Sequence, residues 1–545
     1  VGDRFPSSGG TPARYALPLP HHYLARNPHV ATPGSTQVAS NYSHGYRISA
    51  PHPWRVRRGR DPAWVKFYGK RETNSNYFSG GCSTTFYGGR LFPDEYHGNL
   101  FYCEPSLNIV HRTVLTRDGA GYRAQRAPGE QESEFLASTD QWFRPNGVRT
   151  GPDGALYVVD FYREIIEDYS AIPRYLQQQY GLVKGDDRGR IWRISPAASG
   201  YLRPSNLAKL KPSELVAKLD QPTPWQRLTA QRLLIEKKMT DATAELGKSL
   251  RAAAHPQGRL QAAYTLNGLG TLSVDDLLAG LADANYCVRL HSLRLADARL
   301  GEDERLLKKM TGMVDDPDPL VRLQVAMSLG ESSKPAAVAA LVQLTRQRLD
   351  ERWMKAAILS SVKDIAGELL GGLLAGKKIK PDPALAESLA MIAGSRRHQA
   401  ELAGLIAALE KLGNDDGRLL IPCLKGLYRG LEHGAASPLE DKRARSSLIR
   451  MLKRTEGESL ELCLKIAGQL KLSGSRGLKD FYDKLAADAI DENRAEKDRR
   501  KTLGFLAAGP FETLAGGSDR LLAPAQSPGI QLAAVKAISA MEDPR

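Results

Sequence analysis

A pattern repeated at nearly constant spacing in the second half of the chain constrains the fold more than any other feature. An arginine followed by a leucine opens an apolar stretch four times, at intervals of 32, 30 and 33 residues. These stretches are residues 227–234, 259–266, 289–296 and 322–329. A period of this length is typical of one helical hairpin per repeat. Stacked hairpins bury each other's apolar faces, so the pattern predicts an α-solenoid. The leucines expected in equivalent buried positions are Leu228, Leu260, Leu290 and Leu323.

Acidic residues follow the same period. Asp283 precedes Arg289 by six residues, and Asp316 precedes Arg322 by the same distance. This spacing resembles the aspartate and arginine ladder of HEAT repeats, and we interpret it as structural in preference to ligand binding. The pattern continues less regularly near residues 353 and 530, and the glycine-rich stretch 367–376 is expected to interrupt the stack. We therefore assign residues 221–545 to a HEAT-like α-solenoid.

The first part of the chain has a different pattern. Up to residue 196, short apolar runs rich in aromatic residues alternate with turn signals such as Asp118-Gly119, which is typical of all-β structure. Residues 162–181 look like a partly helical excursion. Residues 197–220 are expected to be a linker. A chain of 545 residues is too long for one core, so the sequence predicts a multidomain β + α protein.

Residues 135–163 are the most informative stretch of the β-rich part. Gly151-Pro152-Asp153-Gly154 predicts a tight turn, because proline fixes the φ angle that starts a type I turn and glycine allows the chain to leave it. The run 155–159 is apolar on both faces and predicts a buried strand. Asp160 comes at its end, where all-β folds commonly collect ligand groups. We expect a polar pocket there.

Charge, nucleotide-binding motifs and cysteine content indicate which ligands and covalent links the chain can have. The formal net charge is +15, but basic residues are dispersed among acidic ones, and the one compact cluster, residues 55–60, is interpreted as a solvated loop in preference to a polyanion site. Nucleic acid is therefore an unlikely partner. The sequence lacks the glycine-rich nucleotide loops that would indicate NAD or ATP. Of the five cysteines, Cys82 and Cys103 lie in the β-rich part. The sequence allows two alternatives for this pair, a disulfide or two free thiols.

Several runs within about residues 1–200 carry a family resemblance. They are residues 22–30, 87–93, 98–105, 108–112, 135–163 and 187–194. The set resembles the large planctomycete-type membrane-bound dehydrogenases, whose β-propeller is similar to sugar and sorbosone dehydrogenases and is followed by HEAT-type repeats and often a c-type haem domain. The resemblance implies that residues 1–196 are the C-terminal part of a β-propeller. Two departures stand out: Asn146-Gly147 follows the Arg-Pro pair, and no Cys-x-x-Cys-His haem motif occurs.

The resemblance also implies a cofactor site. Oxidation of a hydroxyl group with pyrroloquinoline quinone needs a base for the proton and cations for the reduced quinone. His22 and His29 are the candidates for the base, although a loop histidine bound to backbone groups is the alternative for each. Arg144 and Arg163 are the candidates for binding the quinone.

Asp160 and the Gly151-Pro152 turn complete the predicted site. Asp160 is the third catalytic candidate, with capping of the following turn as the alternative. The Gly151 and Pro152 carbonyls are the candidates for binding the Ca²⁺ that assists the quinone, since calcium accepts backbone oxygen ligands.

Two functions from different classes follow. The first is a quinone-dependent sugar or polyol dehydrogenase that donates electrons to a cytochrome c-type domain or partner. The alternative is a non-catalytic propeller that binds carbohydrate or protein, with the HEAT repeats as a scaffold for protein docking. Because Val1 opens the chain, we expect a piece of a longer protein that acts in the periplasm or elsewhere outside the cytoplasm, associated with the membrane through its missing parts.

Overall fold

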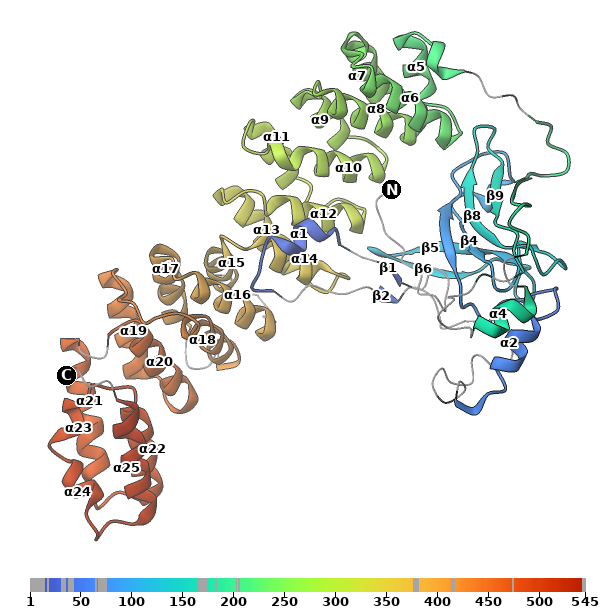
Figure 1. Ribbon diagram of the computed structural model, residues 1–545. Coiled ribbons are helices and arrows are strands. Elements are labelled where there is room, and N and C mark those ends of the chain that lie inside the picture. Colours follow the sequence, from blue (N-terminus) through green and yellow to red (C-terminus); the bar gives the residue numbers. More distant parts are fainter. Residues whose placement is uncertain are drawn as a thin grey trace. The chain divides into compact units, whose positions relative to one another are not determined.

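The computed structural model describes most of the chain, in two units (Figure 1). The described residues are 15–16, 19–30, 36–37, 44–63, 66, 76–164, 166, 174–181, 184–201, 203, 206–375, 382–412, 417–472 and 475–541. The first unit consists of Val1–His21, Pro33–Ser328 and Glu351–Trp353, and the second of His22–Thr32, Leu329–Asp350 and Met354–Arg545. All the described strands belong to the first unit.

The strands form small antiparallel sheets. They are β1 (Tyr15–Ala16), β2 (Thr36–Gln37), β3 (Cys82–Phe86), β4 (Leu100–Glu104), β5 (Ile109–Asp118), β6 (Gly121–Arg126), β7 (Leu136–Ala137), β8 (Pro145–Thr150), β9 (Leu156–Asp160) and β10 (Arg190–Ile194). β3 to β6 pair in chain order, and β7 joins the edge of β5. β8, β9 and β10 form a second sheet. Phe101 and Val110 of the first sheet share one buried core with Val148 and Leu156 of the second.

Most helices of the first unit follow its last strand along the chain, and two of the described α-helices lie between strands. Its helices are α2 (Pro53–Arg58), α4 (Arg174–Tyr180), α5 (Pro212–Lys218), α6 (Pro224–Glu236), α7 (Thr243–Ala252), α8 (Pro256–Leu269), α9 (Val274–Leu281), α10 (Tyr286–Ala296), α11 (Glu304–Thr311) and α12 (Pro319–Leu329), whose last residue falls in the second unit. α4 confirms the expected helical excursion, whereas residues 55–58 of the predicted basic loop 55–60 belong to the short helix α2. Proline opens α5, α6 and α8 at a position where its missing N–H costs nothing.

The second unit is built from helices throughout its described residues. They are α1 (His21–Ala25), whose first residue falls in the first unit, α13 (Pro335–Arg348), α14 (Met354–Ser361), α15 (Ala366–Leu374), α16 (Pro383–Arg396), α17 (Gln399–Glu410), α18 (Gly417–Glu432), α19 (Lys442–Arg454), α20 (Gly457–Gln469), α21 (Arg476–Ile490), α22 (Glu496–Leu506), α23 (Glu512–Ala515), α24 (Ser518–Leu522) and α25 (Pro528–Ala540). The expected interruption at 367–376 is wrong over its described part, because α15 continues through it. Among the described residues, no helix is both long enough and apolar enough to cross a bilayer.

Packing between helices follows the repeat. In the first unit, the second helices of successive hairpins, α6, α8 and α10, contact one another, and α7 contacts α9. In the second unit, α15, α17 and α19 form one such layer, and α16, α18 and α20 form the other. The predicted mixed β and α chain with HEAT-like helices is confirmed at this level. The described sheets do not close into a ring, so the predicted β-propeller is not confirmed.

The four equivalent leucines do not share one environment. Leu290 and Leu323 are buried, with 8% and 2% of their surface exposed, and Leu260 is partly buried. Leu228 is 57% exposed, so its predicted burial is wrong. α6, which carries Leu228, packs against α8 on one side, and no second helix of an earlier repeat precedes it among the described helices. The first hairpin of a stack therefore leaves open a face that later hairpins bury.

A short N-terminal segment packs on the helices of the second unit. The Asn27 amide donates a buried hydrogen bond to the Leu359 carbonyl at 2.7 Å. The Arg26 guanidinium donates to the Ser360 carbonyl at 2.8 Å and pairs with Glu331 at 2.6 Å. The sequence assigned this segment to the β-rich domain, because no local pattern reports a contact between residues more than 300 positions apart.

Candidate functional site

The β8–β9 hairpin positions the residues that the sequence singled out. Its turn forms as expected: the Gly154 N–H donates to the Gly151 carbonyl at 3.1 Å, and Gly154 has a φ of +85°, which favours glycine. Asp153 is buried and pairs with Arg193 at 2.6 Å, which fixes the turn against β10. Asp160 ends β9 opposite Pro145, at the other end of the hairpin from the turn.

The Asp160 carboxylate organises the polypeptide around it. One oxygen accepts the Arg144 N–H at 2.8 Å and the Tyr162 N–H at 3.0 Å, and the other accepts the Trp192 indole N–H at 3.1 Å. The carboxylate is buried and Tyr162 has a φ of +50°, a strained conformation that the hydrogen bond from its N–H holds in place. Asp160 therefore caps a turn of the main chain, as the alternative interpretation expected, although residues 161–164, which the structure describes directly after it, are not helical.

The Arg144 guanidinium is also occupied by the main chain. It is 4% exposed and donates to the carbonyls of Pro105 at 2.9 Å, Arg163 at 3.0 Å and Glu164. Arg163 contributes its carbonyl to this cluster, while its guanidinium lies over the Phe161 ring, 4.5 Å from the centroid. Arg144, Asp160 and Arg163 thus come together as predicted, but they form a packed corner and not an open pocket.

The Arg144 and Asp160 side chains are engaged by the protein itself and do not face an open site. Arg144 donates to main-chain carbonyls and Asp160 accepts from two main-chain N–H groups and the Trp192 indole, while the Gly151 carbonyl accepts one N–H and keeps a second lone pair. The Gly151-Pro152 turn was expected beside Asp160 but lies at the opposite end of the hairpin. In the part of the chain that the structure describes, no group of three or more His, Cys, Asp or Glu side chains is arranged to hold a metal ion.

The two histidines proposed as bases lie in the N-terminal segment. His22 is on α1 and His29 follows it, and both are exposed. Between them, Asn27 binds Leu359 and its side-chain oxygen accepts the His29 N–H at 3.2 Å. This segment belongs to the second unit, whereas Arg144 and Asp160 belong to the first.

Sequence reasoning missed a buried charged cluster in the larger sheet. The Glu134 carboxylate is fully buried, 2.6 Å from the His111 ring and 2.8 Å from the Arg126 guanidinium. Burial alone would raise the pKa of Glu134, but the hydrogen bonds and charges of His111 and Arg126 outweigh it, so this pKa lies below its ordinary value. Phe78 packs against the His111 ring. No spacing in the sequence signals this contact, because Glu134 lies in irregular structure.

The predicted ladder in the helical repeats is confirmed. Arg259 pairs with Asp283 at 2.6 Å, and Arg289 pairs with Asp316 at 2.7 Å. Each arginine also donates to a carbonyl six residues before it, as Arg289 does to Asp283 at 2.9 Å. One guanidinium therefore joins the turn of its own repeat to the acid of the next. Further steps of the ladder are Arg322 to Glu351, Lys355 to Asp382 and Arg499 to Gln526.

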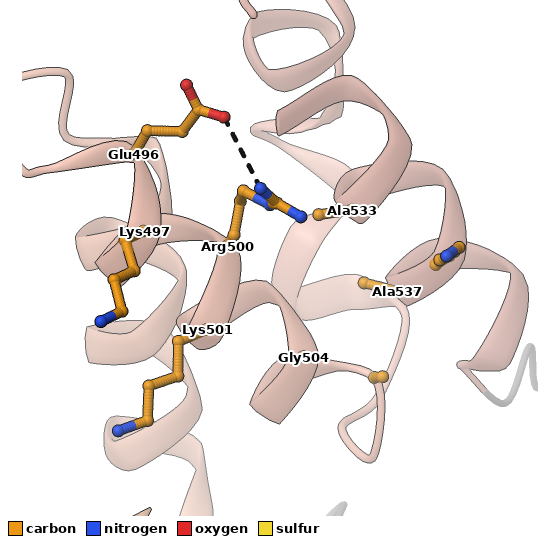
Figure 2. Close-up of a pocket in the computed structure, with 9 residues that line it drawn as sticks. Glu496, Lys497, Arg500, Lys501, Gly504, Ala533 and Ala537 are labelled. Atoms are coloured by element: carbon orange, nitrogen blue, oxygen red, sulfur yellow. Dashed lines mark ion pairs between the residues drawn. The ribbon is translucent and has the colours of Figure 1, made fainter. Parts of the chain in front are cut away.

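A groove lies between α22 and α25 (Figure 2). Its cavity volume is about 740 Å³. Glu496, Lys497, Arg500 and Lys501 line it from α22, and Lys536 lines it from α25. Small residues complete the lining, namely Gly504, Ala507, Ala533 and Ala537. Figure 2 shows Arg500 extending toward Ala533.

The groove carries a strong positive charge. Four of its lining residues are cationic and one, Glu496, is acidic. Glu496 lies 3.9 Å from Arg500, at the outer limit of an ion pair. Within the described residues, no carboxylate lies within ion-pair distance of Lys497, Lys501 or Lys536. The sequence did not single out this groove, because its cations are spaced like those of any solvated helix face and only the packing of α22 on α25 brings Lys536 to the others.

Two family models match separate parts of the chain. A family described as "Domain of unknown function (DUF7133)" matches residues 1–198, and the HEAT repeat family matches residues 274–361. The second match contains the ladder residues Asp283, Arg289, Asp316 and Arg322. No curated protein matches the chain.

Several solved structures are similar to the chain at low identity. An engineered protein shares 16% identity over 62% of this chain and 99% of its own, with a TM-score of 0.28. Kap121p shares 12% identity over 61% of this chain and 41% of its own, with a TM-score of 0.36. Kap121p bound to RanGTP gives a TM-score of 0.35 at 13% identity, over 61% of this chain and 42% of its own. The chain thus spans about two fifths of Kap121p.

Proposed function

We propose that this chain is a non-catalytic protein-binding scaffold whose helical repeats bind an acidic segment of a partner protein. The observation that carries the proposal is the charge of the groove between α22 and α25, which places four cations around one acid. Cations gathered in a concave site attract and orient an acidic ligand more strongly than dispersed surface charges do.

The shape of the groove supports a polypeptide ligand. Its floor is made of glycine and alanine, and such small side chains let another backbone approach closely. Leu532, one turn before the lining residue Lys536 on α25, is 56% exposed, so an apolar side chain of a bound segment has a partner there. An extended or helical segment with two or three carboxylates and an apolar residue would match these features.

The position of the groove in the repeat architecture supports the same function. α22 packs on α25 as second helices of successive hairpins, and the ladder step from Arg499 to Gln526 joins the two repeats. Repeat stacks usually present one face of their helices to partners, because each repeat contributes a few side chains to an extended surface.

The test is binding of a labelled acidic peptide, followed by fluorescence anisotropy at about 50 mM salt. A twelve-residue peptide of glutamate, alanine and leucine should bind, and a peptide with lysine in place of glutamate should not. The double variant Arg500→Glu with Lys536→Glu should weaken binding at least about tenfold, and higher salt should weaken binding to the unmodified protein. The control reverses the exposed Lys248 and Lys308, on helices of the first unit, and should change affinity less than about twofold. If both double variants lose affinity equally, binding depends on the overall charge of the protein and not on the groove, and the proposal is refuted.

For the β-rich part, the two antiparallel sheets packed on one core support the proposal that they are neighbouring blades of a β-propeller. The quinone-dependent dehydrogenase stays a prediction, with a sugar or polyol as its substrate. The same holds for its pyrroloquinoline quinone and Ca²⁺, its cytochrome partner and its location outside the cytoplasm. Their test is reduction of an artificial electron acceptor by the full-length protein with a sugar, with and without quinone and Ca²⁺. Since the Arg144 and Asp160 side chains are engaged by groups of the protein itself, we expect any such activity to use other residues.

A further inference from the structure

Two cysteines lie directly opposite each other on neighbouring strands. Cys82 of β3 pairs with Cys103 of β4 in the antiparallel register. Opposite residues on such strands have Cα atoms about 4.5–5.5 Å apart, which falls within the range of about 4.4–6.8 Å that disulfides span. Both thiols are free in the structure.

The two side chains also share one face of the sheet. Cys103 is a fully buried member of the core between the two sheets, and Cys82 packs against the same core. The Cys82 sulfur lies 3.7 Å from the Asn146 carbonyl, on the side of β8. Cross-strand partners on one face bring their side chains together, so the two sulfurs can reach each other by rotation about their side-chain bonds.

From this geometry we propose that Cys82 and Cys103 are a thiol–disulfide site that closes to a cross-strand disulfide when the protein meets a small-molecule disulfide oxidant. The Cys82 thiolate attacks one sulfur of the oxidant, forming a mixed disulfide and releasing one thiol of the oxidant. The Cys103 thiolate then attacks the Cys82 sulfur, which releases the second thiol. The two protein thiols lose two electrons and two protons in total, and the oxidant is reduced from one disulfide to two thiols.

Exposure makes Cys82 the entry point. It begins β3 and is partly exposed, whereas Cys103 is fully buried. Burial, with a smaller contribution from the nearby Glu104, raises the pKa of the Cys82 thiol to about 11. The thiolate fraction at neutral pH is therefore small, and closure should accelerate about tenfold for each unit of pH between 7 and 9.

The test uses the reduced 545-residue chain with glutathione disulfide as the oxidant. Thiol titration should show the loss of two of the five thiols, and peptide mapping without reductant should find the 82–103 bond. The thermal midpoint should rise by several degrees, since the bond closes a loop of about 20 residues. Cys82→Ser should keep Cys103 reduced, while Cys287→Ser should leave the bond unaffected. Retention of all five thiols, or a stable glutathione adduct on Cys82, would overturn the proposal, because either result means that Cys103 does not reach Cys82.

Discussion

The β-rich region and the helical repeats each contain an arginine that links distant backbone segments, but the two arginines do so in different ways. The difference explains which contacts can be predicted from a sequence. In the helical repeats, Arg289 joins a carbonyl six residues earlier to Asp316 of the next repeat, 27 residues later. In the β-rich region, Arg144 binds carbonyls of Pro105 and Glu164, on either side of it in the chain. The first arrangement recurs with a period and can be read from spacing. The second occurs once and consists of main-chain acceptors, which have no sequence signature.

The largest effect should come from removing the unrepeated arginine. Arg144→Ala leaves buried carbonyls without donors, and we expect a loss of about 4 kcal/mol in the free energy of unfolding of the β-rich region. Arg144→Lys should recover only part of the lost free energy of unfolding, since one ammonium group cannot reproduce the guanidinium fork. Hydrogen exchange of residues 100–163 would measure the change, with the helical repeats of the same molecule as the internal reference. A loss below about 1 kcal/mol would show that the corner is hydrated and that Arg144 is available to a ligand after all.

A smaller loss is expected where the arginine belongs to the ladder. Arg289→Ala should cost about 2–3 kcal/mol, because Asp316 is left nearly buried without its partner, though neighbouring steps of the ladder remain. The double variant Arg289→Ala with Asp316→Ala should be less destabilised than the two single variants together predict. Urea unfolding of the four proteins would measure the coupling, and additive effects would mean that the ion pair is not an independent link between repeats.

The folding stability of the two regions should also depend on pH in different ways. Because the folded pKa of Glu134 is lowered, its charge contributes stability that is present above its unfolded pKa of about 4.3 and is lost as pH falls through the lower folded value. The β-rich region should therefore lose stability on acidification from about pH 5. Glu134→Gln should be less stable near pH 7 and should show a flatter dependence below pH 5. Thermal unfolding at several pH values would measure this, and parallel profiles for the two proteins would contradict it.

Features that recur with a regular spacing, or that involve residues close together, were predicted correctly from the sequence. The sequence predicted the helical repeats, the ladder and the Gly151 turn, because each depends on residues close together or on a regular spacing. It grouped Arg144 with Asp160 correctly, since both flank one hairpin, but it could not tell a packed corner from a pocket. That distinction depends on carbonyls supplied by other parts of the chain.

Features that depend on packing between distant segments were not predictable. The contact of Asn27 with the Leu359 carbonyl joins residues 332 positions apart. The groove depends on the packing of α22 against α25, and the charged cluster at Glu134 depends on how a loop meets two strands. In each case, the residue types alone describe an ordinary polar position.

The N-terminal segment offers a test of moderate size. Asn27→Ala removes the buried donor to the Leu359 carbonyl, and we expect a loss of about 1–2 kcal/mol in the stability of the second unit. Asn27→Asp should cost at least as much, because a carboxylate cannot donate to a carbonyl. Hydrogen exchange at residues 354–375 would report the loss. Unchanged protection there would mean that the segment is a passive attachment to the helices.

The smallest single effect should come from one of two leucines that the repeat spacing makes equivalent. Leu228 and Leu290 both follow the ladder arginine of their repeats, but Leu228 is 57% exposed and Leu290 is 8% exposed. Leu290→Ala should cost about 2–4 kcal/mol, because it removes a packed side chain and leaves a cavity. Leu228→Ala should change stability by less than about 0.5 kcal/mol, because most of its surface already faces solvent and alanine favours a helix. Urea unfolding of both variants would compare them directly. A large loss for Leu228→Ala would mean that its face of α6 is covered in solution, and it would restore the equivalence that the repeat spacing predicted.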